Sequence, residues 1–174
     1  MRGQKGASDI DTESTIMKKT VVAALLLAAL PAVATAMDKI AVQPNALKWG
    51  PAPASMPPGA QIAVVTGDPG KDGPYVVRAK LPARYKIPPH THPTVENVTV
   101  LSGVFNIAMG DKFDTKKGEA VKPGGFFTAE KDMQHYGWTT GPTVIQIHGM
   151  GPFAINYVNP GDDPRNAKPT AKKQ

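Results

Sequence analysis

The sequence predicts an all-β protein, an antiparallel sandwich or barrel preceded by an extended N-terminal arm. From Gln61 onward, short runs rich in β-branched and aromatic residues alternate with turns rich in glycine and proline. No segment sustains the apolar spacing of a helix. Residues 38–59 contain five prolines among few periodic apolar residues, which favours an extended arm. With 174 residues, the chain is long enough for one such domain.

The expected strands follow one another at close intervals. In chain order they cover residues 62–66, 75–81, 95–101, 104–109, 126–128, 136–139 and 143–148. Ser102 and Gly103 lie between the third and fourth of these runs, where a hairpin needs a residue that tolerates positive φ. Alternation places Phe105, Ile107 and Met109 on one face, where we expect them to join the core.

Residues 17–36 predict a secretory signal peptide. Two lysines precede an apolar run over 21–30, and Ala34-Thr35-Ala36 offers small residues for cleavage. The apolar run is shorter than the roughly 20 residues that a membrane-spanning helix needs. We therefore expect the mature chain to begin at Met37, to be periplasmic or secreted, and to make no membrane contact once the signal is removed.

Residues 1–16 do not fit in front of such a signal. They are polar and carry three acidic residues, where a signal peptide begins with basic ones. We interpret them as a mis-set start or a remnant of cloning. The sequence leaves open whether Met1 or Met17 is the true first residue.

The composition excludes several classes of function. The absence of cysteine excludes disulfides, thiolate metal ligands and cysteine nucleophiles. The formal net charge is +6, but the basic residues are scattered and lack the aromatic–basic stripe of a nucleic-acid surface. Part of the surplus lies in residues 159–174, a basic tail with little to bury, which we expect to be mobile unless a partner holds it. Neither a glycine-flanked nucleophile nor a phosphate-binding glycine loop is present.

Three of the four histidines form a pattern that suits a metal ion. His90 and His92 are two residues apart, so on an extended strand their side chains point to the same side. Glu96 follows after Pro93, which is expected to end the strand, and His135 comes from a later segment. Three imidazoles and one carboxylate suit a divalent transition metal. A proline-rich surface turn would explain the first two histidines alone, but not the whole set at these spacings.

This stretch resembles the first motif of the cupin superfamily, G-x5-H-x-H-x3-4-E-x6-G. The residues from His90 to Gly103 match it, while Arg84 stands where the motif begins with glycine. The two motifs and their spacer cover residues 84–139, and the surrounding strand pattern extends the resemblance to residues 60–158.

The second cupin motif, G-x5-P-x-G-x2-H-x3-N, can be laid on residues 124–139 without a gap. Gly124 takes the first position and His135 the ligand histidine. The proline, second glycine and asparagine positions hold Glu130, Asp132 and Thr139. Asp132 can still occupy the turn, because aspartate tolerates the left-handed backbone region better than most residues.

The resemblance implies a single jelly-roll (cupin) barrel over residues 60–158, preceded by the arm at 37–59. It also implies one metal ion held by His90, His92, Glu96 and His135, with Fe(II) favoured and Mn, Ni, Cu or Zn also suited to the donors. A homodimer is implied as well. Because sheet edges need cover, we expect the arm to cross onto a neighbouring subunit with Trp49 as an anchor.

Three further residues are candidates for substrate contact. Tyr136 has the opposite parity to His135 and belongs either to the core or to the substrate site. Gln146 and His148 share one face of the run 143–148, opposite two isoleucines. They either face solvent while the isoleucines fill the core, or point inward as substrate-binding groups, with His148 then also catalytic. The sequence leaves both arrangements open.

The function implied by the resemblance is that of an exported, mononuclear metal-dependent oxidoreductase of the dioxygenase type, acting on a small oxygenated molecule. In such an enzyme Glu96 would be catalytic, able to accept a proton if it loosens from the metal. The alternative is a non-catalytic cupin that binds a metal or small ligand for periplasmic storage or sensing. An open coordination site favours the enzyme and a closed one favours storage.

Overall fold

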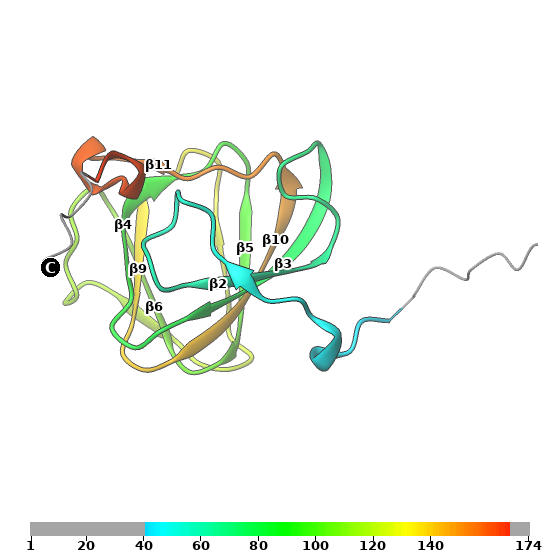
Figure 1. Cartoon of the computed structure of the whole chain (residues 1–174). Coiled ribbons are helices and arrows are strands. Elements are labelled where there is room, and N and C mark those ends of the chain that lie inside the picture. The colour runs from blue at the N-terminus through cyan, green and yellow to red at the C-terminus, as the bar shows by residue number, and fades with distance from the viewer. Residues whose placement is uncertain (1–40, 168–174) are drawn as a thin grey trace, which may run out of the picture. The chain divides into compact units, whose positions relative to one another are not determined.

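The computed structural model describes residues 41–167, and the predicted signal peptide, the residues before it and residues 168–174 lie outside that range. The described chain forms eleven short strands and three 3-10 helices (Figure 1). The strands are β1 (Gly50–Pro51), β2 (Gln61–Thr66), β3 (Gly73–Leu81), β4 (Lys86–Thr91), β5 (Glu96–Ser102), β6 (Phe105–Met109), β7 (Glu119–Val121), β8 (Phe126–Ala129), β9 (His135–Thr139), β10 (Thr143–Gly151) and β11 (Asn156–Tyr157). The 3-10 helices are η1 (Pro44–Ala46), η2 (Pro160–Asp162) and η3 (Pro164–Asn166). Within residues 41–167, none of the helices has the length and apolar character that a membrane crossing requires.

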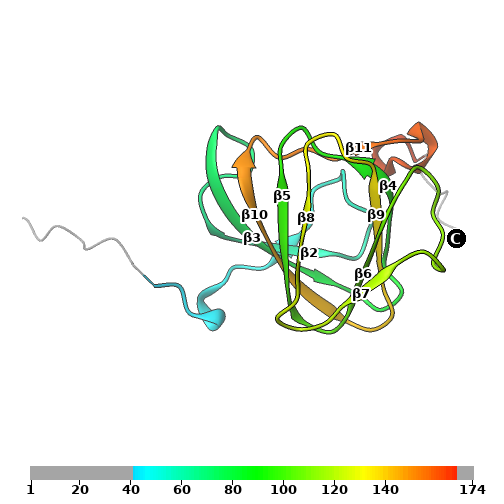
Figure 2. The ribbon, with the colours of Figure 1, turned by 180° about the vertical axis from the view of Figure 1, so that it is seen from behind.

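The strands build two antiparallel sheets that face each other (Figures 1 and 2). One sheet has the order β1-β2-β3-β10-β5-β8 and the other the order β11-β4-β9-β6-β7. From β3 to β6 and again from β7 to β11, successive strands alternate between the two sheets. The predicted all-β class is confirmed, and this alternation agrees with a jelly roll.

Each of the seven predicted strands is present with slightly different ends, but the predicted hairpin is wrong. β5 belongs to the first sheet and β6 to the second, so the turn at Ser102 and Gly103 carries the chain across the fold. The need for glycine is nevertheless confirmed, since Gly103 has φ of 76°. A Cβ atom there would lie 2.4 Å from the carbonyl oxygen of Pro142, just before β10.

The strand β4 was expected only around the histidines and is longer, although it contains Pro88 and Pro89. Proline lacks a backbone donor for a ladder. The pairing of β4 with β9 is accordingly irregular between Ile87 and His90, and it resumes at His90. The prolines thus interrupt the ladder without ending the strand.

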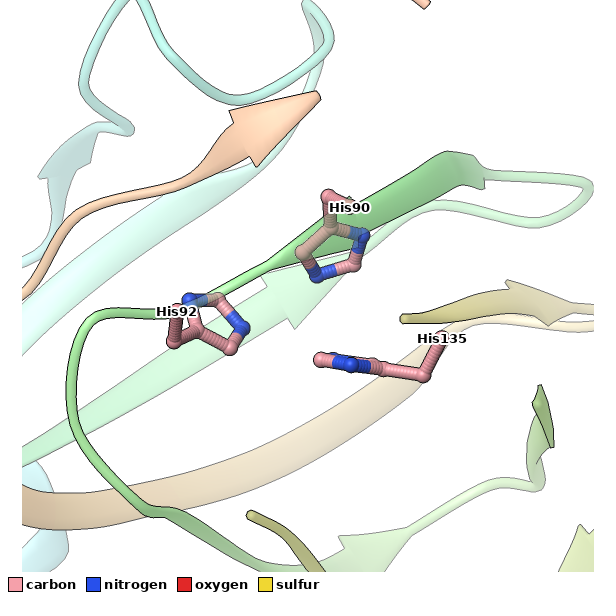
Figure 3. Close-up of side chains that lie close together, drawn as sticks. All are labelled: His90, His92 and His135. Atoms are coloured by element: carbon pink, nitrogen blue, oxygen red, sulfur yellow. The ribbon is translucent and has the colours of Figure 1, made fainter. Parts of the chain in front are cut away.

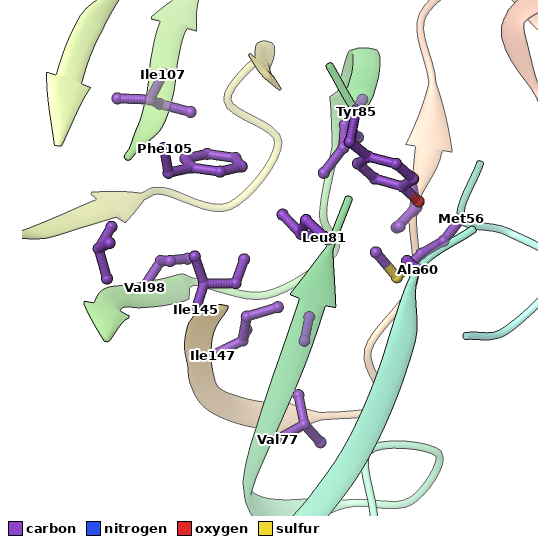
Figure 4. Close-up of a cluster of buried hydrophobic side chains, with 14 of the residues drawn as sticks. Met56, Ala60, Val77, Leu81, Tyr85, Val98, Phe105, Ile107, Ile145 and Ile147 are labelled. Atoms are coloured by element: carbon purple, nitrogen blue, oxygen red, sulfur yellow. The ribbon is translucent and has the colours of Figure 1, made fainter. Parts of the chain in front are cut away.

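The core lies between the sheets and is built from the inward residues of alternating strands (Figure 4). On β5, Glu96, Val98 and Val100 are buried, as alternation predicts. Phe105 and Ile107 also join the core, whereas Met109 at the end of β6 is 50% exposed. The prediction that Met109 is a core residue is therefore wrong: β6 ends at this residue, and its side chain is exposed although its register partner His135 is buried.

The arm divides into two parts. Residues 41–46 are exposed, but Met56 and Ala60 are buried in the core of their own chain (Figure 4). The hydroxyls of Tyr85 and Tyr157 donate to the carbonyls of Pro57 and Ser55, the latter at 2.8 Å. Residues 50–60 thus pack on their own chain and cover one end of the fold.

The first part of the basic tail, residues 159–167, makes contacts within the chain. Residues 159–167 contain η2 and η3, and each begins after a side-chain cap, from Asn159 and Asp163 respectively. Arg165 pairs with Asp163 at 2.7 Å and donates to the carbonyl of Ile155 at 3.2 Å. These contacts hold the segment against the chain that follows β10.

Two residues that replace glycines of the cupin motifs share one backbone conformation. Arg84 and Asp132 have φ of 60° and 59°, and they are the positive-φ residues other than glycine in the described chain. The hydroxyl of Thr139, at the motif asparagine position, accepts from the amide of Tyr85 and donates to the carbonyl of Pro82. Arg84 and Asp132 thus adopt a backbone conformation that glycine, the motif residue at both positions, adopts most readily.

Candidate metal centre

The pairing of β4 with β9 brings the predicted histidines together. His90, near the end of β4, is the register partner of His135, the first residue of β9. His92 follows one residue after β4 ends. Its ring centroid lies 4.9 Å from that of His90 and 5.1 Å from that of His135. Figure 3 shows the three rings converging on one space between the sheets.

Each ring is oriented by a hydrogen bond from Nδ1 to a backbone carbonyl. His90 pairs with Pro88 and His92 with Ala154, both at 2.7 Å, and His135 pairs with Met133 at 2.9 Å. A carbonyl oxygen can only accept, so Nδ1 carries the proton in all three neutral rings. The lone pair of each ring is therefore on Nε2, the atom that is left for a ligand.

The remaining ring atoms fit a metal ion. One ligand atom from each histidine lies within 4.8 Å of the others, and the three residues are buried. The Nε2 atoms of His92 and His135 are buried without a hydrogen-bond partner. A buried polar atom that lacks a partner is costly, and a shared cation would relieve two of them at once. The donor set of neutral imidazoles suits a divalent transition metal.

Glu96 approaches the histidines from the opposite sheet. It is the first residue of β5, after the turn that Pro93 begins. One carboxylate oxygen lies 3.4 Å from Nε2 of His92 and 3.7 Å from Nε2 of His135. Atoms bound to one ion at about 2.1 Å are roughly 3–4 Å apart, so these separations suit joint ligation. The carboxylate is buried.

Burial and the carboxylate set the protonation of the site. Burial lowers the pKa of His90 to about 3, and repulsion from His135 and His92 adds to this effect. Burial acts in the same direction on His92, but the nearby negative charge of Glu96, 3.4 Å away, outweighs it and raises the pKa. Burial favours protonated Glu96, yet the two neighbouring histidines outweigh it and hold its pKa below the usual range. Glu96 is thus ionised and His90 neutral at neutral pH, as ligation requires.

Sequence reasoning missed the segment that supports His92. The ring of Phe153 stacks on His92 with centroids 4.7 Å apart at an angle of 27°, and the next residue, Ala154, supplies the carbonyl for Nδ1. Both follow β10, far from His92 in sequence. A backbone carbonyl leaves no signal in a sequence, and a single phenylalanine after a strand is an ordinary core residue by pattern.

The histidines lie at one end of a cavity of about 210 Å³, and the rest of its wall is apolar. Its wall includes Val98 of β5, Ile107 of β6, and Ile145 and Ile147 of β10. Gly137, two residues after His135 on β9, also faces it, which confirms the predicted parity. The centre therefore has empty space next to it that a small molecule could enter.

The remaining candidate residues are not brought to this cavity. The isoleucines of β10 fill the inward face, so Gln146 and His148 lie on the outer face of the sheet. Gln146 accepts a hydrogen bond from Arg78 at 3.0 Å, and the ring of His148 lies 6.3 Å from that of Phe126. The inward arrangement considered for the two residues, with His148 catalytic, is corrected accordingly.

Tyr136 is also separated from the cavity. It is fully buried in a second cluster, with Trp138 and Phe113, on the other side of β9 from His135. Its hydroxyl donates to the carbonyl of Asp114 at 3.0 Å. Tyr136 is thus a packing residue, the first of the two roles that the sequence left open.

The chain matches one protein family and resembles several solved structures. The family model described as the ChrR cupin-like domain matches residues 37–154. Similar solved structures include the polyketide cyclase RemF from Streptomyces resistomycificus, with 19% identity, 71% of this chain and 88% of that one covered, and a TM-score of 0.55. A candidate acetylacetone dioxygenase from Methylibium petroleiphilum PM1 shows 17% identity, 71% and 83% coverage, and a TM-score of 0.54. An RmlC-like cupin from Shewanella frigidimarina shows 9% identity, 63% and 87% coverage, and a TM-score of 0.50. These identities show a shared fold alone, and a search of curated protein sequences returns no significant match.

Proposed function

Because the chain belongs to the family of ChrR cupin-like domains, we propose that it is an exported metalloenzyme that acts on a small molecule. One divalent transition metal is held by His90, His92, Glu96 and His135. The reaction is of the oxidative, dioxygenase type, with Fe(II) as the favoured metal. The export part of the proposal rests on the signal-like residues 17–36, and an intact mass that begins at Met37 tests it.

The observation that supports a metal most directly is the state of the histidine rings. All three Nδ1 atoms are engaged by backbone carbonyls, and the Nε2 atoms of His92 and His135 are buried without a partner. A purely structural histidine cluster would be expected to satisfy these atoms. Their convergence beside an ionised carboxylate is what a cation site needs.

A metal bound here would supply Lewis acidity, and a redox-active one would activate a chelated substrate toward dioxygen. The residues of the chain supply orientation and exclusion of water. The carbonyls of Pro88, Ala154 and Met133 hold the rings in place, and the apolar wall keeps the centre dry. Glu96 is the one carboxylate among the residues that line the cavity, so it is the group that would accept a proton.

The same observation favours a second candidate, a non-catalytic cupin that binds a metal or small ligand. No lining side chain outside the proposed ligand set is a carboxylate or an imidazole. If Glu96 remains bound to the metal, the cavity therefore has no free group of either kind. The lining would then hold a ligand without a group to move its protons. The cavity next to the centre, which gives a substrate room, is the reason for placing the enzyme first.

Oxygen uptake by the Fe(II)-loaded protein separates the two candidates. Hydroxy acids, diketones, catechols and thiols cover the small chelating substrates that the site could take. We expect uptake with one of these classes, its loss in His135→Ala, and its retention in His148→Ala, whose side chain faces outward. A protein that keeps its iron and consumes no oxygen with any class would favour the binding function.

A further inference from the structure

The cavity next to the metal centre carries an inference about the substrate, which rests on the proposed function and adds a chemical class to it. We propose that the ligand is a small molecule with one anionic, metal-binding end and an apolar body that lacks hydroxyl or amine groups. Sugars and other polyhydroxylated molecules are thereby excluded. This class is supported by the apolar wall of the cavity, by the size of the cavity, and by the charge of the proposed metal centre at its end.

The wall offers almost nothing that can form hydrogen bonds to a ligand. Apart from the four proposed metal ligands, Ser55 is the one lining residue with a polar side chain, and it belongs to the loop that covers the end of the fold. The other lining residues are aliphatic or aromatic residues, prolines, glycines and Met56. A hydroxyl group on the body of a ligand would be buried without a partner, which costs binding free energy.

Strands of both sheets contribute to this apolar wall. Ile87 comes from β4, Val98 from β5, Phe105 and Ile107 from β6, and Ile147 from β10. Figure 4 shows several of these side chains gathered between the sheets. Each is an inward residue of its strand, so the fold itself, rather than a flexible loop, makes the cavity apolar.

The size of the cavity limits the ligand. An apolar protein cavity of about 150 Å³ takes up benzene. At about 210 Å³, the present cavity accepts a body somewhat larger than a benzene ring. Met56 lies at the covered end, where tyrosine hydroxyls hold the loop through Ser55 and Pro57.

The end of the cavity at the proposed metal centre favours a negatively charged group on the ligand. A divalent ion with three neutral imidazoles and one carboxylate has a net charge of +1, from +2 and −1. Among the described residues that line the cavity, no other acidic side chain is available to balance it. In apolar surroundings an unbalanced charge is costly, so an anionic end such as a carboxylate or an enolate is preferred.

The test measures binding to the Co(II)-loaded protein through the cobalt absorption bands. Acetate, butanoate and hexanoate share one end and differ in the apolar body. Burial of each added methylene is expected to tighten binding about fourfold. The paired probe 6-hydroxyhexanoate adds one hydroxyl to hexanoate, and it should bind at least about fivefold more weakly, because the hydroxyl has no partner. Equal affinity for acetate and hexanoate, or tighter binding of the hydroxylated acid, would overturn the proposal.

Two adjacent residues of β10 give matched variants. Ile147→Phe narrows the cavity and should reduce the affinity for hexanoate to that for acetate. His148→Phe changes the outer face of the same strand and should leave both affinities unchanged. If Ile147→Phe does not fold, Val98→Leu adds one methylene to the same wall and should weaken hexanoate selectively. Equal effects of Ile147→Phe and His148→Phe on the affinity for hexanoate would contradict the proposal that the ligand lies in this cavity.

Separate measurements test whether the protein binds a metal and whether its cavity takes up an apolar ligand. If the protein binds no cobalt, the metal function is wrong, and the apolar cavity is then tested in the metal-free protein with benzene. A rise in Tm with benzene, absent in Ile147→Phe, supports the apolar class without the metal. No rise in the folded metal-free protein would overturn the apolar class itself.

Discussion

Arg84 occupies a backbone conformation that glycine adopts at lower cost. Its φ of 60° lies in the left-handed region, its side chain is exposed, and the related cupin motif has glycine there. The left-handed conformation costs a residue with a side chain about 1–2 kcal/mol, part of which glycine returns through its greater freedom in the unfolded chain. The strain is therefore local to the backbone and can be removed by one substitution.

We expect Arg84→Gly to increase the free energy of unfolding by about 0.5–1 kcal/mol, measured by urea denaturation. Arg84→Ala is the matched control, since it removes the same side chain and keeps the strain. Asp132→Gly should give a smaller gain, because aspartate tolerates this region better. A gain in Arg84→Ala equal to that in Arg84→Gly would show that the side chain, and not the backbone, is responsible.

The protonation of the histidines predicts how metal affinity depends on pH. His90, with its pKa lowered to about 3, remains neutral and does not compete with the metal. His92 has its pKa raised by Glu96, so in the metal-free protein a proton must leave it before the metal binds. Affinity should therefore fall as pH decreases below the raised pKa, by at least about tenfold per pH unit. Titrations with Zn(II) between about pH 8 and pH 5 check this, and a constant affinity over that range would contradict it.

At the scale of the elements, alternation predicted the strands and their inward faces, but not how they pair. The residues of β5, the turn and β6 have the pattern of a hairpin, yet the pairing surface of β5 is taken by β10 and β8. These partners are far away in sequence, so local spacing could not indicate them. In the same way, the H-x-H spacing predicted the ligand face, whereas Phe153 and the carbonyl partners depend on tertiary contacts.

Gly103 tests the turn that carries the chain between the sheets. A side chain there would require positive φ and would approach the backbone before β10 within 2.4 Å. We expect Gly103→Ala to reduce the free energy of unfolding by about 2 kcal/mol or more. Gly141→Ala is the control, since no atom lies within 4 Å of a Cβ at that position. Equal losses in the two variants, measured by thermal unfolding, would contradict the proposed role of the turn.

At the scale of the whole molecule, the predicted homodimer now depends on the first part of the arm. Residues 50–60 pack on their own chain, and Lys80 lies 4.0 Å from the ring of Trp49, so of the described arm residues 41–48 are left to reach a neighbour. Val42 and Val64 are 42% and 48% exposed, so apolar surface remains for that contact.

We predict a dimer by light scattering at micromolar concentration and a monomer after deletion of residues 37–48. The deletion leaves Met56 and the loop that covers the cavity in place, so the fold should be retained, which circular dichroism checks. A full-length chain that is monomeric, with no change on deletion, would show that the arm does not join subunits.

Elemental analysis of the purified protein tests the metal centre most directly. The predicted result is one transition-metal ion per chain in the unaltered protein and in His148→Ala, whose side chain is outside the cavity. His135→Ala should contain none, because it removes one of the converging ring nitrogens. A folded His135→Ala protein with its full metal content would contradict the centre described here.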